Sequence, residues 1–202
     1  MANQKISAKL YGAILATGLM SFCVVIVETS MNVAFLTLMT QFKVSTNTVQ
    51  WLTTIYLLMV ATVVPLSANL KRAFKTRNVF LTANLLFITG VVLDLITPNF
   101  SLLLIGRVIQ GLGTGIALPL MFNIILEQVP PQRTGFMIGV GTLITAIAPA
   151  IGPTFGGLVV ANLSWRYIFA FLPILIFSLI LGLFTIKQTT QFKRLNLISG
   201  VS

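Results

Sequence analysis

Long apolar runs without a charged residue dominate the chain. They cover residues 10–27, 44–70, 78–93, 108–126, 134–165 and 167–186. A helix needs about 20 mainly apolar residues to cross the hydrocarbon core of a bilayer. We therefore expect an all-α membrane protein with six transmembrane helices. The pattern predicts them at about 11–37, 48–70, 78–97, 101–126, 135–161 and 165–186.

Little of the chain is left outside these helices. The expected connections are short, so neighbouring helices should run antiparallel and residues 1–202 should form one six-helix bundle. Composition agrees with this interpretation, because only 8% of the residues are charged, whereas about 25% is usual for soluble domains. Trp51 and Trp165 fall at predicted helix ends, where aromatic residues commonly meet the membrane interface.

The positive charge is distributed unevenly between the two sides of the predicted bundle. The net charge is +10, and ten cations lie at the two ends of the chain or in alternate connections. They are Lys5, Lys9, Lys71, Arg72, Lys75, Arg77, Arg133, Lys187, Lys193 and Arg194. The opposite side has only Lys43 and Arg166. Because cytoplasmic loops carry the excess of Lys and Arg, both termini are expected in the cytoplasm. This distribution does not indicate nucleic-acid binding.

Several chemistries are excluded or disfavoured by the residue types. The chain has no histidine, one cysteine (Cys23) and three acidic residues without a close pair. Histidine-based catalysis and metal sites are therefore excluded, no cofactor or metal is expected, and a membrane enzyme is disfavoured. The glycines of "GLGTG" (111–115) lie inside a predicted helix, not between a strand and a helix, so they do not indicate a nucleotide site.

Arg107 is the most unusual residue of the predicted membrane region. A charged side chain within the bilayer is costly and typically functional. Two interpretations stay open. Arg107 lies about 9 Å from the start of its helix, at 1.5 Å per residue, and can snorkel outward. Alternatively, Arg107 and Gln110 share one helix face and point into a polar cavity, which we favour.

Glu28 is the natural counter-charge of Arg107. It falls near the middle of the first predicted helix, with Asn32 one turn further on the same face. An intramembrane carboxylate is a candidate for binding and releasing a proton. The alternative is a structural hydrogen bond between Glu28 and Asn32.

Three further features are candidates for roles in packing or gating. Ala148, Gly152 and Gly156 make a small-residue face, and Pro149 and Pro153 bend the same helix, which suits either a hinge or close helix packing. Asp94 is expected at the outer membrane interface. Glu127 lies at the cytoplasmic end of its helix, where it either pairs with the basic 71–77 connection or is a solvated helix end.

Four motifs together resemble the major facilitator superfamily, and more narrowly its drug:proton antiporters with 14 membrane spans. They are "ETSMNVAFLTLM" (28–39), "LLLIGRVIQGLGTG" (102–115), "APAIGPTFGGLV" (148–159) and "LSWRYIF" (163–169). The resemblance implies that Arg107 organises a proton-relay site and that Glu28 and Asn32 line the cavity. It also implies an antiporter hinge, formed by Gly152, Pro153, Gly156 and Gly157.

The chain departs from the family pattern in three places. In "SANLKRAFKTRNV" (67–79), Ala68 and Lys75 replace glycines and Arg72 replaces an aspartate, which puts the usual cytoplasmic charge lock of this loop in doubt, although Arg77 remains. We assign the cytoplasmic gate to Arg72, Arg77 and Glu127. Leu36 stands where a proline is common. The family fold also has two six-helix bundles, and this chain contains only the first.

The sequence therefore predicts the N-terminal half of a proton-coupled exporter of drug-like molecules in the plasma membrane. It is expected to act by alternating access, together with a second six-helix half or as a homodimer. Its other partners are protons and the lipid bilayer. The alternatives are an uptake carrier of the same fold and a non-transporting membrane subunit.

Overall fold

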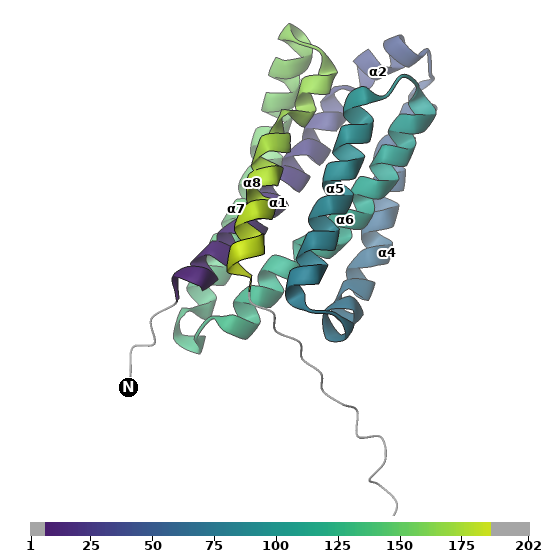
Figure 1. The fold of residues 1–202 in the computed structure, drawn as a ribbon. Helices are drawn as coiled ribbons and strands as arrows, with labels where there is room; N and C mark the ends of the chain where they lie inside the picture. The colour runs from purple at the N-terminus through teal and green to yellow at the C-terminus, as the bar shows by residue number, and fades with distance from the viewer. Residues whose placement is uncertain (1–6, 187–202) are drawn as a thin grey trace, which may run out of the picture.

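The computed structural model describes residues 7–186, apart from the side chains of residues 68 and 72, and confirms an all-α six-span bundle (Figure 1). The six spans, all long and apolar enough to cross a membrane, are built from α1, α3 with α4, α5, α6, α7, and η1 with α8; the short α2 follows α1. The elements are α1 (Ala8–Val33), α2 (Phe35–Phe42), α3 (Thr46–Val49), α4 (Trp51–Ala73), α5 (Thr76–Ile96), α6 (Phe100–Gln128), α7 (Pro131–Asn162), η1 (Trp165–Phe171) and α8 (Leu172–Thr185).

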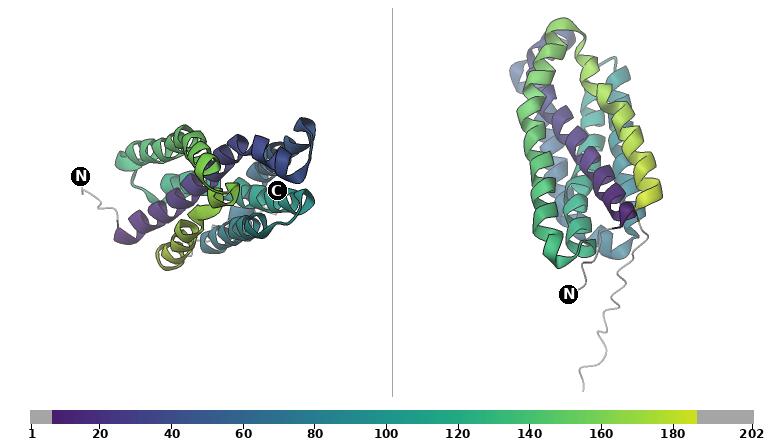
Figure 2. Two further views of the ribbon diagram at one scale, coloured as in Figure 1. Left: turned by 90° about the horizontal axis from the view of Figure 1, so that it is seen from above. Right: turned by 90° about the vertical axis from the view of Figure 1, so that its left-hand side faces the viewer.

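α1 and α6 are the two central helices of the bundle. Within their most apolar stretches, 67% and 61% of the residues are buried, against 22% in the span that contains α4 and in α7. α6 packs between α4 and α5, whereas α1 packs between α7 and α8 and also contacts α6 (Figure 2). The bundle therefore consists of two helix groups that meet along α1 and α6.

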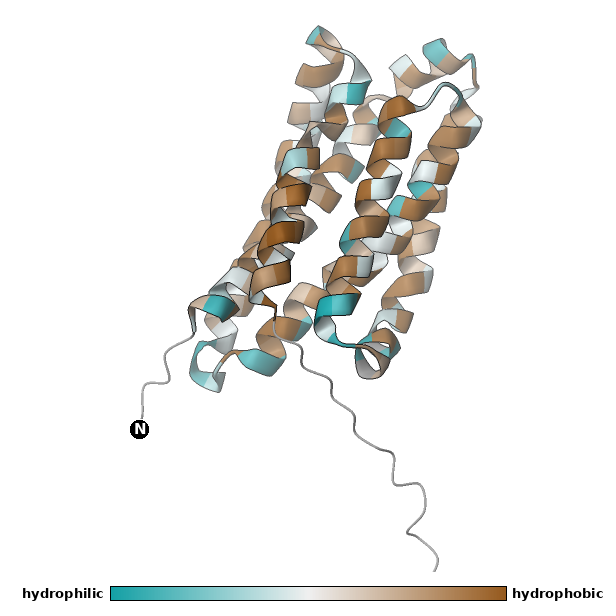
Figure 3. Cartoon of the chain, viewed as in Figure 1, coloured by the Kyte–Doolittle hydropathy of each residue, from teal (hydrophilic) through white to brown (hydrophobic). Residues whose placement is uncertain are grey.

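Polar residues gather at the ends of the bundle, and apolar residues line the lengths of the helices (Figure 3). The start of α1, the end of α8, and the α4–α5 and α6–α7 connections lie at the same end (Figure 1). This end holds Lys9, Lys71, Lys75, Arg77 and Arg133. Four other cations of the predicted positive side, Lys5, Lys187, Lys193 and Arg194, lie outside the described residues.

Side-chain oxygens cap the N-terminal ends of several helices. Ser7 accepts a hydrogen bond from the Leu10 N–H at the start of α1, and Asn99 accepts one from the Leu102 N–H at the start of α6. The first N–H groups of a helix have no partner inside it, and these side chains supply one. Pro131 begins α7, where its missing N–H costs nothing.

The glycines of "GLGTG" contact the two neighbours of α6 alternately. A Cβ on Gly111 would lie 2.7 Å from the Tyr56 carbonyl of α4, and a Cβ on Gly113 would lie 2.7 Å from the Ala83 carbonyl of α5. A Cβ on Gly115 would again meet α4, at Val63. In lipid, helices associate through close packing and not through a hydrophobic force. These glycines therefore allow α6 to lie against both neighbours.

The predicted small-residue face of α7 packs closely on α1, which confirms this part of the interpretation. A Cβ on Gly152 would overlap Thr29, and one on Gly156 would lie 2.6 Å from the Ser30 carbonyl. The Ser30 hydroxyl also donates to the Gly152 carbonyl at 2.8 Å. Pro153 is exposed and Gly157 is half-buried, so they take little part in this contact.

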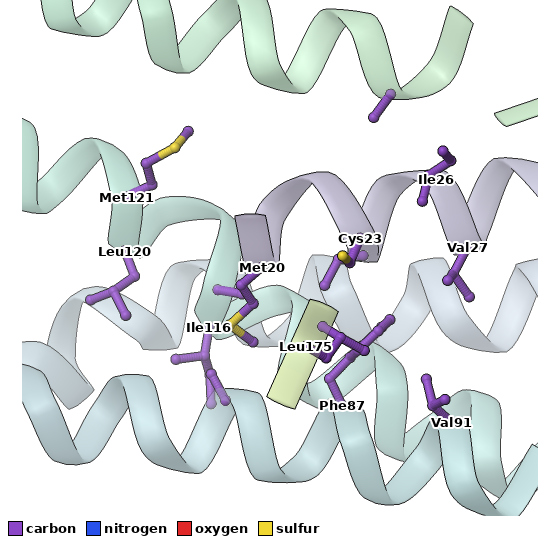
Figure 4. Close-up of a cluster of buried hydrophobic side chains, with 14 of the residues drawn as sticks. Met20, Cys23, Ile26, Val27, Phe87, Val91, Ile116, Leu120, Met121 and Leu175 are labelled. Carbon is purple, nitrogen blue, oxygen red and sulfur yellow. The ribbon is translucent and has the colours of Figure 1, made fainter. Parts of the chain in front are cut away.

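Apolar side chains from α1, α5, α6 and α8 fill the centre of the bundle (Figure 4). Met20 and Cys23 of α1 lie among Phe87 of α5, Ile116 of α6 and Leu175 of α8. Cys23 is fully buried, as expected for a small core residue.

Two local predictions differ from the structure. The first span was expected to continue to residue 37, but α1 ends at Val33 and α2 follows it. Trp165 is not an interfacial anchor, because it is 1% exposed and its indole N–H donates to Gln41 Oε1 at 2.6 Å. The last span begins with the 3₁₀ turns of η1, since Pro173 lacks the N–H that an α-helix would use there.

Gly113→Ala is expected to destabilise the bundle by about 1–3 kcal/mol, because the new methyl group would press on backbone atoms of α5 that cannot rotate away. Gly139→Ala is the matched control, since nothing lies within 4 Å of its Cβ position. Melting temperatures of the purified variants in detergent test this. Equal melting temperatures would contradict the close contact between α5 and α6.

Candidate functional site: the buried arginine of α6

Arg107 is completely buried in protein and does not snorkel. Its exposure is 0%, and its Nε donates to the Leu52 carbonyl of α4 at 3.3 Å. Its guanidinium carbon lies 4.2 Å from the centre of the Tyr56 ring, a distance typical of cation–π contacts. Its Nη1 donates to Gln110 Oε1 at 2.8 Å, one turn along α6. A guanidinium stays charged in proteins. These contacts with α4 and α6 therefore replace part of the hydration that it has lost.

Gln110 links Arg107 to α5. Its Nε2 donates to Asp94 Oδ2 at 2.8 Å, and both side chains are 0% exposed. The expectation that Asp94 lies at the membrane interface is therefore wrong. A Cβ on Gly106 would overlap Asp94 Oδ1, so the missing side chain at Gly106 creates the space that the carboxylate occupies.

Tyr56 connects the arginine to the α1 side of the bundle. Its hydroxyl lies 3.0 Å from the Thr114 hydroxyl, and it also interacts with Glu28. Glu28 is half-buried and lies close enough to interact electrostatically with Arg107. The structure therefore brings together Glu28, Arg107 and Gln110 of the predicted site, and adds Tyr56 and Asp94.

Asn32 lies apart from this group and is exposed. Its Oδ1 accepts a hydrogen bond from the Thr53 hydroxyl of α4 at 2.6 Å. This bond joins the end of α1 to the start of α4. The hydrogen-bond partner of Asn32 in the structure is therefore Thr53, and not Glu28 as in the alternative interpretation.

One of the predicted gate residues, Glu127, forms an ion pair at the basic end of the bundle. Glu127 Oε1 of α6 lies 2.5 Å from Lys71 Nζ of α4. Arg77 is half-buried in the first turn of α5, and the side chain of Arg72 lies outside the described residues. Glu127 thus contacts the 71–77 region through Lys71.

A pocket of about 390 Å³ lies between the end of α4 and the start of α5, and Ile116 of α6 is one of its lining residues. Its other lining residues are Leu70, Phe74, Asn78, Val79 and Thr82. None of them belongs to the group around Arg107, so this pocket does not place a substrate beside the arginine.

The sequence-family model of the Major Facilitator Superfamily matches residues 17–196 of this chain. The chain belongs to this superfamily. The facilitator fold also appears in a solved structure, a bacterial homolog of the human lysosomal transporter Spinster in an inward-facing and unoccupied conformation. The TM-score is 0.65 at 16% identity, with 88% of this chain and 42% of that chain covered. At this identity the likeness shows the fold alone.

Relatives of this facilitator chain include proteins named for drug resistance. The chain is 40% identical over 165 residues to the lincomycin resistance protein LmrB of Bacillus subtilis, with 81% of this chain and 34% of the relative covered. It is 34% identical over 155 residues to a multidrug resistance protein B homolog of Mycobacterium tuberculosis, with 76% of this chain and 29% of the relative covered. The chain thus spans about a third of the length of these curated relatives.

Tyr56 and Asp94 are residues of this facilitator site that the sequence interpretation missed. The buried residues of α5 recur every three or four positions, and Phe87, Gly90 and Asp94 belong to this series. Residues at this spacing share one helix face. The periodicity therefore contained the signal that Asp94 points into the bundle.

Arg107→Lys is expected to lower stability by about 1–3 kcal/mol, although the charge is kept. A lysine cannot bond to Leu52 and Gln110 with a rigid planar fork and stacks less well on Tyr56. Thermal unfolding in detergent measures this, with Arg77→Lys as the control at a half-buried arginine. A loss of equal size in both variants would contradict the special role of the Arg107 contacts.

The Lys71–Glu127 pair is expected to contribute at most about 1 kcal/mol in this conformation, because both partners are partly exposed, at 11% and 33%. A double-mutant cycle of Lys71→Ala and Glu127→Ala measures the coupling energy by chemical unfolding. A coupling energy several times larger would contradict a weak surface contact.

Proposed function

We propose that this chain is the N-terminal half of a proton-coupled exporter of drugs or other small amphipathic molecules, and that it acts by alternating access. The observation that carries the proposal is the buried charge group of Arg107, Gln110 and Asp94, with Glu28 at its edge. Buried ionisable groups within membrane spans are costly and typically mark ion or substrate paths. The names of the relatives, lincomycin resistance and multidrug resistance proteins, support drug-like substrates.

In this mechanism, Glu28 binds a proton from the outer side and releases it to the cytoplasm. The proton changes the charge that faces Arg107, and this change favours one arrangement of the bundle over the other. The α7 residues Gly152, Pro153, Gly156 and Gly157 are proposed as the hinge along which α7 moves against α1. Lys71 and Glu127, with Arg72 and Arg77 nearby in the sequence, are proposed to close the cytoplasmic side.

We further propose that transport requires a second six-helix half, either from a separate chain or from a second copy of this one. α4 and α7 are the least buried spans, and Asn32 is exposed near the start of α4. Polar groups exposed to lipid are unfavourable, so a partner over these helices would remove that cost. The cluster of cations at one end supports an orientation with both termini in the cytoplasm. The bacterial relatives support a location in the plasma membrane.

Dye movement in inside-out vesicles tests the proposal. One preparation holds the 202-residue chain alone, and a second adds the part of the Bacillus subtilis lincomycin resistance protein that this chain does not span. An acidic vesicle interior is expected to drive accumulation of a fluorescent cationic dye in at least one preparation, and Arg107→Ala is expected to abolish it. Gly139→Ala serves as the expression and insertion control, because nothing lies within 4 Å of its Cβ position.

The other outcomes separate the alternatives. Dye that leaves the vesicle together with the proton, instead of entering against it, would indicate an uptake carrier. Absence of proton-dependent movement in both preparations, with both chains inserted, would contradict transport and favour a non-transporting membrane subunit.

A further inference from the structure

The carboxylate of Asp94 is poorly compensated inside the bundle. Gln110 donates to its Oδ2, whereas Oδ1 has no hydrogen-bond partner among the described residues. Its side chain is 0% exposed. An ionised carboxylate is very unfavourable in such surroundings unless a cation is near or a proton binds. Asp94 therefore requires either a nearby cation or a bound proton.

Arg107 is the cation available to Asp94. It acts on Asp94 electrostatically and through the bridging amide of Gln110. The other cation at this end of α5 is Arg166 of η1, whose Nε and Nη2 donate to the carbonyls of Leu95 and Thr97 at 3.1 and 2.8 Å. α8 also packs on α5, but the stretch Leu172–Thr185 contains no ionisable side chain.

Arg107 also interacts electrostatically with Glu28. Glu28 is a residue of α1 and interacts with Tyr56 as well, whereas Asp94 interacts with Arg107 from α5. The group thus contains two carboxylates and one guanidinium. Because a single positive charge cannot compensate both carboxylates fully, the proton affinity of each depends on whether the other is charged.

We propose that Asp94 is a second proton-binding site of this bundle and that it shares the guanidinium of Arg107 with Glu28. The Oδ1 atom takes the proton, since Oδ2 already accepts from Gln110. Water supplies the proton, one O–H bond forms on Asp94, and its charge changes from −1 to 0, so that Arg107 then compensates Glu28 alone. The O–H bond of protonated Glu28 then breaks, its proton passes to water, and its charge changes from 0 to −1. One proton is bound and one is released, and no other covalent bond changes.

This inference rests on the proposed function for its role in transport, but not for its test. Asp94 lies two residues before the end of α5, at the end of the bundle opposite Lys75. If the basic end is cytoplasmic, Asp94 is the carboxylate nearer the outer side. In that orientation, a proton that binds Asp94 from the outer side would favour release of the proton of Glu28.

Infrared spectroscopy of the purified 202-residue chain tests the shared site, because the chain has only three Asp and Glu residues. The carboxyl C=O band of protonated groups is recorded across a pH titration in the wild type, Asp94→Asn and Glu28→Gln. Glu127→Gln is the matched control at a partly exposed carboxylate outside the group. Melting temperatures verify that each variant is folded.

We expect a titrating band that Asp94→Asn removes. In the same variant, the band of Glu28 is expected to titrate at a pH lower by about one unit or more, because the two sites interact. The Glu127→Gln control should leave both bands in place. Absence of a titrating Asp94 band, or an unchanged Glu28 titration in Asp94→Asn, would overturn the proposal.

Gln110→Leu provides a second variant that keeps both carboxylates, in case Asp94→Asn does not fold. Loss of the amide donor is expected to move the C=O frequency of protonated Asp94 and leave that of Glu127 in place. An unmoved Asp94 band would contradict the Gln110 bridge. If the titrations of Asp94 and Glu28 depend on each other but no dye moves in the vesicle assay, only the proposed transport function is overturned. If dye moves but the two titrations are independent, only the role of Asp94 is overturned.

Discussion

The burial of one guanidinium constrains the arrangement of three helices. Arg107 of α6 contacts the Leu52 carbonyl and the Tyr56 ring of α4, and it reaches Asp94 of α5 through Gln110. Removing a charge from water costs several kcal/mol, and these contacts offset part of that cost. They therefore favour the observed packing of both α4 and α5 on α6.

Close helix packing makes the burial possible. The apolar surface of a helix gains little by leaving lipid for protein, so glycines and short polar bonds determine which helices associate. Gly106, Gly111 and Gly113 bring α4 and α5 near enough to α6 for the side chains of the charge group to meet. The same principle holds on the other side of the bundle, where Gly152 and Gly156 lie against α1.

The six spans, an inward-facing arginine and a small-residue packing face on α7 could be predicted from the sequence, because each rests on a local pattern, whereas the helix that packs on this face could not. Length and hydropathy define a span, and small residues four apart define a packing face. Asp94 lies two residues before the end of α5, a position typical of interfacial residues, but it belongs to the periodic buried face of that helix. The partner of Glu127 within the basic loop and the burial of Trp165 against Gln41 depend on contacts between distant segments, which no local pattern contains.

Enclosure of the Arg107 guanidinium by protein should slow the exchange of its N–H protons with water, and NMR spectroscopy measures this exchange. The chain is labelled with ¹⁵N-arginine, and the Arg107 signal is assigned by its absence from the Arg107→Lys spectrum. We predict that the Nε–H of Arg107, bonded to the Leu52 carbonyl, exchanges far more slowly than that of Arg77. Exchange at the same rate in both residues would contradict the enclosed arginine and the organisation derived from it.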